Sequence, residues 1–263
     1  MKNYFYLIEI QYLGFRYHGW QKQLDVKTVQ GMVERTLNFI FDHDNFKTLA
    51  AGRTDAMVSV NQSAFELFLR EPIDKDKLLE DLNFNFPADI RALSIQEVNQ
   101  KFNIIKNAKQ KEYLYLFSFG SKNHPFCAPF ISYVNRDLDV ELMKTGARLF
   151  VGHHNFRQYA HKPGDAASFN REVLTSEIVI NDLYTASFFP EENYIFRVRG
   201  MGFLRYQVRL MMGTLFRLGK GEISLEDIIQ SLKGEHEETI GYIAPSSGLM
   251  LNKVGYSLLK STF

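Results

Sequence analysis

The sequence predicts an α+β fold built from two similar halves. Apolar and polar residues alternate in several short segments, as in half-buried strands, whereas other segments place apolar residues at helical spacing. This mixture occurs before residue 120 and is repeated after it. Residues 121–129 join the two parts, contain two prolines and include no long low-complexity linker. We therefore expect residues 1–120 and 121–263 to be two halves of one molecule and not independent domains.

Capping residues and periodicity locate the individual elements. Thr28 is the expected N-cap of a helix whose apolar residues repeat through about residue 42, and Ser224 begins a Ser-x-x-Asp cap for a helix that ends near residue 232. Further helices are expected at 74–83, 139–150 and 203–218. Strands are expected at 4–11, 48–51, 62–69, 92–98, 112–119, 173–180, 185–189, 194–198 and 250–256.

Composition is that of an ordinary globular protein of a reducing compartment. Of the 263 residues, 45% are hydrophobic and 23% are charged. The single cysteine, Cys127, has no partner for an internal disulfide, a zinc knuckle or a Cys-x-x-Cys pair. No stretch approaches the ~20 apolar residues of a membrane span, and Glu9 interrupts the apolar N-terminal run. We expect a cytoplasmic protein that is neither secreted nor inserted in a membrane.

Charge is distributed unevenly along the chain, although the net charge is only +1. Acidic residues are missing from three windows that carry several lysines or arginines: 98–111, 142–164 (which includes Lys162) and 199–221. A run of like charge is often no more than a solvated face. Three such windows, two of them with interleaved aromatic residues, favour a groove for a nucleic acid.

The segment 203–218 is apolar nearly all round, which predicts a helix buried on most faces. Arg205 and Arg209 nevertheless lie four residues apart on it. A buried guanidinium needs a carboxylate or phosphate partner, because burying it unpaired costs several kcal/mol. A structural ion pair at the helix edge remains open for Arg205. Arg209, one turn deeper, is the expected partner of a buried acid.

Asp55 is the candidate for the buried acid that pairs with Arg209. It lies in the run Gly-Arg-Thr-Asp, residues 52–55, on a loop between two expected strands and close to Arg53. An aspartate beside threonine and glycine more often bonds its own backbone in a turn than takes part in chemistry. From local chemistry alone, the turn role is the favoured interpretation and the catalytic role is the alternative.

Other motifs give no cofactor or metal site. Residues 200–205 begin like a dinucleotide fingerprint but lack its third glycine, and residues 219–221 lack the spacing of a phosphate-binding loop. His153, His154 and His161 have no carboxylate or cysteine at ligand spacing, so a surface or RNA-facing role is expected for them. We predict neither a metal nor a cofactor.

The run Gly-Arg-Thr-Asp-Ala with Val58 two residues later resembles the signature of the TruA-type pseudouridine synthases. Each further match is weak alone, but the matches occur in the family's order over nearly the whole chain and are together highly specific. They are residues 19–23, 28–30, 82–83 with 86–90, Phe102 and Ala108 with 113–115, 152–156, 203–209 with Gly213, and 244–249.

The resemblance implies a reaction and a set of roles. The family cleaves the C1'–N1 bond of a uridine in RNA, turns the freed uracil and rejoins it through C5, without metal, nucleotide or redox cofactor. Asp55 would be the essential carboxylate. Arg209 would pair with it and keep it ionised. The substrate-binding residues would be Tyr113 stacked on the flipped base, Leu249 on the apolar side of the pocket, Arg53 beside the RNA backbone or in the space of the extruded base, and Arg205.

The resemblance also implies architecture and partners. The expected fold is the pseudouridine synthase fold, in which the antiparallel sheets of two α+β halves join into one extended sheet around a central catalytic cleft. Family members act as homodimers that share one tRNA, so basic windows from two chains would add. Their usual substrate is tRNA, at positions 38, 39 and 40 of the anticodon arm.

The chain departs from the family pattern at two places. Met57-Val58-Ser59 stands where the family has Gly-Val-His, and Phe102-Asn103-Ile104-Ile105 stands where it has Phe-His-Ala-Arg. We expect the chemistry to be retained and the choice of RNA to differ. Two rivals remain: a non-catalytic RNA-binding paralogue, and an unrelated hydrolase with Asp55 as nucleophile, for which no motif supplies a second carboxylate, histidine or metal.

Overall fold

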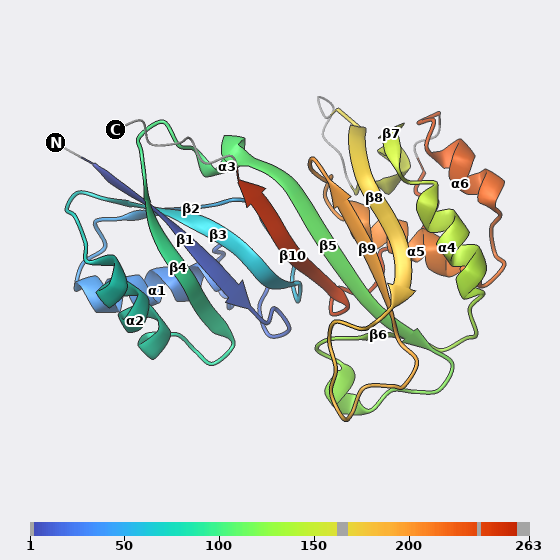
Figure 1. Ribbon diagram of the computed structural model, residues 1–263, viewed down its shortest axis with the longest axis horizontal. Helices are drawn as coiled ribbons and strands as arrows, with labels where there is room; N and C mark the ends of the chain where they lie inside the picture. The colour runs from blue at the N-terminus through green and yellow to red at the C-terminus, as the bar shows by residue number, and fades with distance from the viewer. Residues whose placement is uncertain (1–2, 162–167, 236–237, 257–263) are drawn as a thin grey trace. The chain divides into compact units, whose positions relative to one another are not determined.

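The computed structural model describes residues 3–161, 168–235 and 238–256 (Figure 1). It has the predicted α+β class, because helices and antiparallel strands occur together in both halves. The chain divides into two compact units. The first contains residues up to Lys109 together with residues from Leu251 onward, and the second contains Gln110–Met250.

The sheet of the first unit is centred on β1 (Tyr4–Tyr12), which pairs antiparallel with β3 (Ser59–Leu69) on one side and β4 (Ile90–Val98) on the other. The short strand β2 (Lys47–Ala50) also pairs antiparallel with β3, and β10 (Leu249–Tyr256) lies next to β3 in the strand order. Ile8 and Phe65 oppose each other in the β1–β3 register, and both are fully buried. The strands were predicted from the alternation of apolar and polar residues, which places apolar side chains such as these on the buried face of a sheet.

Two helices, α1 (Val29–Phe41) and α2 (Lys75–Asn85), lie side by side against this sheet (Figure 1). α1 follows the predicted cap Thr28, and α2 follows Asp74, which the sequence pattern placed at the start of the helix. The Thr28 side chain accepts a hydrogen bond from the Gly31 amide, and the Asp74 side chain accepts from the amides of Asp76 and Lys77. The third helix, α3 (Ile104–Asn107), is a single turn that the sequence pattern did not predict.

The sheet of the second unit has the order β5 (Ala108–Phe119), β9 (Tyr194–Gly200), β8 (Asn170–Ile180) and β7 (Gly152–Asn155). These neighbours pair antiparallel, and β6 (Ser132–Val134) adds a parallel pair to β5. The helices are α4 (Val140–Arg148), α5 (Gln207–Gly219) and α6 (Leu225–Ser231), with 3-10 turns at Pro125–Cys127 and Arg157–Tyr159. Ser224 and Asp227 form the predicted reciprocal cap of α6.

The predicted helix 203–218 is wrong at its start. α5 begins at Gln207, and the residue before it, Tyr206, has left-handed backbone angles, φ 61° and ψ 6°. A left-handed residue cannot continue an α-helix, so residues 203–206 lie outside the helix and a turn is formed at Arg205 and Tyr206. Arg205 and Arg209 therefore do not share one helical face. The predicted burial of this helix is confirmed, because the residues of α5 are buried with few exceptions.

The predicted strand 185–189 is also wrong. Residues 181–193 form a loop, and the side chain of Asn181 accepts hydrogen bonds from the amides of Leu183 and Tyr184 within it. Phe188 and Phe189 pack against the buried cluster of Leu114, Leu116, Cys127, Ile131 and Ile195. The aromatic alternation that suggested a strand thus reflects packing of a loop on the core and not pairing in the sheet.

Lys162, which belongs to the second acid-free window, lies outside the described residues. Within residues 3–161, 168–235 and 238–256, none of the helices combines the length and the apolar character that crossing a membrane would require.

Candidate active site

Asp55 lies in the turn that joins β2 to β3, as predicted. Its side chain is half-buried, while Arg53 two residues earlier is exposed. The carbonyl of Asp55 accepts a hydrogen bond from the Val58 amide at 3.2 Å. Met57, between them, has φ 67°, in the left-handed region where the family pattern places glycine. Met57 therefore strains the turn, since a left-handed residue with a side chain costs about 1–2 kcal/mol.

A segment that follows β1, residues 13–20, holds this turn in place. The Trp20 amide donates to the Thr54 carbonyl at 3.2 Å, and the Met57 amide donates to the Tyr17 carbonyl at 2.9 Å. The Gly14 amide donates to the Ser59 hydroxyl at 3.0 Å, so the serine that replaces the family's histidine ties the two segments together. Tyr12, at the end of β1, shares a 2.8 Å hydrogen bond with the Thr54 hydroxyl.

Two glycines permit this close approach. A Cβ atom on Gly14 would lie 2.1 Å from the Val58 carbonyl oxygen, and one on Gly19 would lie 2.5 Å from the Thr54 carbonyl oxygen. Gly19 also has φ 86°, which L side chains rarely adopt. The backbone on both sides of Asp55 is therefore fixed by contacts that only glycine allows.

Asp89 anchors the holding segment. The Leu13 amide donates to the Asp89 carbonyl at 3.0 Å, the Tyr17 hydroxyl donates to its carboxylate at 2.7 Å, and Arg16 binds the same carboxylate with two nitrogens. Burial alone would raise the pKa of Asp89, but the hydrogen bonds from Arg16 and Tyr17 outweigh burial and lower it. The carboxylate thus stays ionised and keeps the segment beside the Asp55 turn.

Arg209 lies in the first turn of α5 and is half-buried. Its Nε donates a 2.6 Å hydrogen bond to the carbonyl of Ala244, and its guanidinium carbon lies 5.1 Å from the centre of the Tyr206 ring. Arg205 is exposed, and its guanidinium carbon lies 5.0 Å from the centre of the same ring. Tyr206 therefore brings the two arginines together, although they do not share a helix.

Tyr113 is half-buried on β5, where it pairs with Val198 of β9. Its ring meets Phe203 edge to face, with ring centres 5.3 Å apart and planes at 89°. Phe203 belongs to the same connection between β9 and α5 as Arg205 and Tyr206. This connection thus carries the aromatic neighbour of Tyr113 as well as the ring that lies near both arginines.

Leu249 is buried at the start of β10. The segment before it is tied to β5, because the Tyr115 hydroxyl donates to the Pro245 carbonyl and the Leu116 amide donates to the Gly248 carbonyl, each at 2.8 Å. One segment, residues 244–249, therefore holds both Arg209, through Ala244, and Leu249.

Histidines and carboxylates do not gather into a metal site within the described residues. His153 lies 3.1 Å from Glu172, His154 contacts the Val151 carbonyl at 2.9 Å, and the His161 ring meets the Tyr206 ring at 5.1 Å. The neighbours of the three histidines are thus one carboxylate, one backbone carbonyl and one aromatic ring, respectively.

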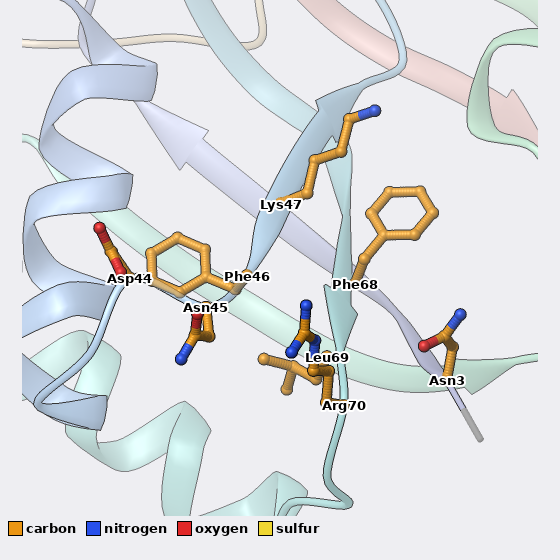
Figure 2. Close-up of a pocket in the computed structure, with 8 residues that line it drawn as sticks. All are labelled: Asn3, Asp44, Asn45, Phe46, Lys47, Phe68, Leu69 and Arg70. Carbon is orange, nitrogen blue, oxygen red and sulfur yellow. The ribbon is translucent and has the colours of Figure 1, made fainter. Parts of the chain in front are cut away.

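Figure 2 shows an open pocket of about 310 Å³ in the first unit, where β2 begins and β3 ends. None of the six residues predicted for the site contributes to its lining. The lining mixes two cations, one carboxylate and two amides with three apolar side chains. Its residues are Asn3, Asp44, Asn45, Phe46, Lys47, Phe68, Leu69 and Arg70.

Sequence reasoning missed the residues that support the site. Gly14 lies outside every matching segment, and Gly19, Asp89, Tyr206 and Ala244 lie within matching segments but have no predicted role. Two glycines five residues apart after a strand are a signal of close backbone approach and could have pointed to the holding segment. Nothing in the sequence predicts a left-handed tyrosine, because that geometry depends on the burial of its neighbours.

Known proteins resemble this chain over nearly its full length. A family model described as tRNA pseudouridine synthase matches residues 147–257. The tRNA pseudouridine synthase A of Dictyoglomus thermophilum is 32% identical over 251 residues, which are 95% of this chain and 98% of the relative. The tRNA pseudouridine synthase A 2 of Bacillus cereus is 30% identical over 253 residues, which are 95% of this chain and 99% of the relative.

A third relative, the tRNA pseudouridine synthase A of Thermodesulfovibrio yellowstonii, is 30% identical and covers 94% of this chain and 97% of its own length. Identity of this level, spread over both units and not confined to one motif, is the ground for assigning the family. The chain belongs to the TruA-type tRNA pseudouridine synthases.

Proposed function

We propose that this protein isomerises uridine to pseudouridine in the anticodon arm of tRNA, at positions 38–40, with Asp55 as the catalytic carboxylate. The observation that carries the proposal is the setting of Asp55. It is half-buried in a turn whose backbone is fixed from both sides by residues 13–20 and by Ser59. A turn held in this way keeps a reactive group within the narrow range of positions that catalysis needs.

The reaction requires an ionised carboxylate. The C1'–N1 bond of uridine breaks and a C1'–C5 bond forms, C5 loses its proton and N1 gains one, so the product is an isomer and no oxidant or reductant is consumed. Asp55 could attack the sugar, attack the ring or remove a sugar proton. All three roles use the charged form of the acid.

We assign to Arg209 the role of keeping this carboxylate ionised. The pairing of Arg209 with Asp55 rests on the family resemblance. The geometry of the second unit supports a fixed position for the guanidinium, which Ala244 holds at 2.6 Å through Nε. A cation whose position is fixed stabilises an anion more effectively than a mobile one, since little entropy is lost when the pair forms.

The remaining predicted residues are assigned to substrate binding. Tyr113 would stack on the flipped base, with Phe203 supporting its ring edge to face. Leu249, which is buried, would close the apolar side of the pocket. The exposed cations Arg53 and Arg205 would contact the RNA backbone.

The assignment to tRNA modification also implies how the protein binds RNA, its oligomeric state and its location in the cell. The acid-free windows would supply phosphate contacts, and a homodimer that shares one tRNA would double them. Residues 1–120 would be the half that carries the Asp55 turn, and residues 121–263 the half that carries the Arg209 helix. We place the enzyme in the cytoplasm, where tRNA is modified.

A direct assay uses purified protein and anticodon-arm transcripts that retain uridine at position 38, 39 or 40 only. Pseudouridine has the same mass as uridine, so it is read by nucleoside chromatography or by a carbodiimide adduct that stops primer extension. We expect product at one or more of the three positions. RNA binding without product would support the non-catalytic paralogue, and product elsewhere in tRNA would overturn the assigned positions.

A further inference from the structure

Tyr206 adopts a backbone conformation that is unfavourable for an aromatic residue. Its φ of 61° and ψ of 6° lie in the left-handed region, which glycine and asparagine tolerate far better. The surrounding turn enforces this conformation. The Gln207 side chain is fully buried and accepts a 2.8 Å hydrogen bond from the Leu204 amide, while the Gln207 amide donates to the Leu204 carbonyl at 3.1 Å. Backbone strain that persists in a well-held turn points to a use for the side chain.

The Tyr206 ring is the common neighbour of three side chains. The guanidinium carbons of Arg205 and Arg209 lie 5.0 Å and 5.1 Å from its centre, within the range of a cation–π interaction. The His161 ring meets it at 5.1 Å with planes inclined at 61°. Tyr206 is half-buried, so these contacts are only partly screened by water.

Arg209 has two restraining contacts as a result. Its Nε is bound to the Ala244 carbonyl at 2.6 Å, and its guanidinium carbon lies 5.1 Å from the centre of the Tyr206 ring. The left-handed turn is what directs the Tyr206 ring toward a residue three positions later on α5. A hydrogen bond at one nitrogen and a ring at the guanidinium carbon together leave the group little freedom to rotate.

We infer that Tyr206 is a positioning residue, whose ring holds the Arg209 guanidinium in the orientation that the isomerisation requires. The inference rests on the proposed function and deepens it, because Tyr206 is assigned no contact with the reacting atoms. Two simpler roles compete with it. Tyr206 could serve only to form the turn, or its ring could stack on RNA and contribute to binding alone.

The test distinguishes the role of the Tyr206 ring from the role of its backbone in the turn. Tyr206→Asn removes the ring and keeps a residue that tolerates left-handed angles, so the turn is preserved or relieved of strain. Tyr206→Phe keeps the ring and removes the hydroxyl. Asp42→Gly is the matched control, because Asp42 is also left-handed, with φ 55° at the end of α1, and has no part in the proposed site.

The measured quantities are the single-turnover rate constant for pseudouridine formation, the Kd for the anticodon arm and the Tm. We expect Tyr206→Asn to lower the rate constant roughly threefold to tenfold, the range expected for a partly desolvated cation–π contact, with Kd and Tm close to the parent. Tyr206→Phe should recover most of the rate. Asp42→Gly should leave the rate unchanged.

A double-mutant cycle shows whether Tyr206 acts through Arg209. In an Arg209→Met background, Tyr206→Asn should cause no further loss of rate, since the group that it positions is gone. Equal and additive losses in both backgrounds would overturn the inference, as would a parental rate in Tyr206→Asn or a weaker Kd with an unchanged rate. The proposed function fails separately, if Asp55→Asn retains the parental rate or the parent forms no pseudouridine.

Discussion

Arg209 and Ala244 are joined by two hydrogen bonds that run in opposite directions. The Arg209 side chain donates from Nε to the Ala244 carbonyl at 2.6 Å, and the Ala244 amide donates to the Arg209 carbonyl at 3.2 Å. The first bond fixes the guanidinium and the second fixes the backbone of α5 at the same residue. The position of this cation is therefore set by residues 244–249 as much as by its own helix.

Replacing Arg209 should change the pH dependence of the reaction. Arg209→Met removes the cation assigned to Asp55, and the loss of a nearby positive charge disfavours the ionised carboxylate. The sign is therefore fixed: the acidic limb of the kcat profile should move to higher pH. Arg209→Lys should restore activity only in part, because an ammonium group cannot keep the guanidinium geometry. The measurement is kcat against pH for the three proteins at saturating RNA.

The same profile contains the result that would contradict the pairing. If Arg209 only gripped phosphate, Arg209→Met would raise KM and weaken the salt dependence of binding while the acidic limb stayed in place. Thermal unfolding of each variant serves as the control, because Arg209 also holds Ala244 and its loss could loosen that segment.

Gly19→Ala should impair catalysis through the shape of the Asp55 turn. The new Cβ would lie 2.5 Å from the Thr54 carbonyl oxygen at φ 86°, so the turn must move. We expect kcat to fall by at least about tenfold, since small displacements of a catalytic group are costly, and stability to fall by about 1–3 kcal/mol. Gly221→Ala is the matched control, because Gly221 has φ 71° with nothing within 4 Å of its added Cβ. A parental kcat in Gly19→Ala would show that the turn tolerates the shift.

Asp89 should make stability depend on acid pH. Its pKa is lowered in the folded protein, so its stabilisation is complete above the ordinary aspartate value of about 3.9 and is lost as the pH falls through the lowered pKa. Tyr17 should contribute more than Arg16, whose side chain is 55% exposed, and we expect roughly 1–2 kcal/mol in total. The Tm of Asp89→Asn should lie below that of the parent at pH 7, and the two should converge as the pH falls through the lowered pKa. Parallel Tm curves would exclude Asp89 as the source of this dependence.

Tyr113 should act through its ring. Tyr113→Phe keeps the stacking surface and the edge-to-face contact with Phe203, so most activity should remain. Tyr113→Leu loses a stacking contact worth ~1–3 kcal/mol per base, which corresponds to roughly a fivefold to 150-fold lower kcat/KM. Steady-state kinetics on the anticodon arm compare the two variants. Equal activity in both would indicate that Tyr113 is ordinary core.

The sequence predicted elements whose causes are local. Thr28 and Ser224 cap α1 and α6 as expected, because a cap depends on residues only three positions apart. The predicted start of α5 is wrong because apolar residues continue back to Phe203. In the structure the buried Gln207 side chain binds the Leu204 amide, and Tyr206 between them is left-handed and lies outside the helix. Local periodicity contains no information about that tertiary contact.

In the site, too, features with a local cause could be predicted from the sequence and features that depend on distant contacts could not. The loop position of Asp55 follows from the strands on either side of it, which the alternation of residues predicts. The contacts that hold the loop, from Gly14 and Trp20 and ultimately from Asp89, join residues about 30 to 75 positions apart and have no local pattern. Family resemblance supplied the roles of the residues, and the structure supplied what keeps them in place.

The most direct test of the account is pseudouridine formation by Asp55→Asn. Asparagine has the size of aspartate and suits the same turn, but it carries no charge and can neither attack nor accept a proton as a carboxylate does. The account predicts a loss of turnover of about 10³-fold or more, with the Kd for the anticodon arm and the Tm close to those of the parent. Turnover near the parental rate in Asp55→Asn would remove Asp55 from the mechanism and contradict the account at its centre.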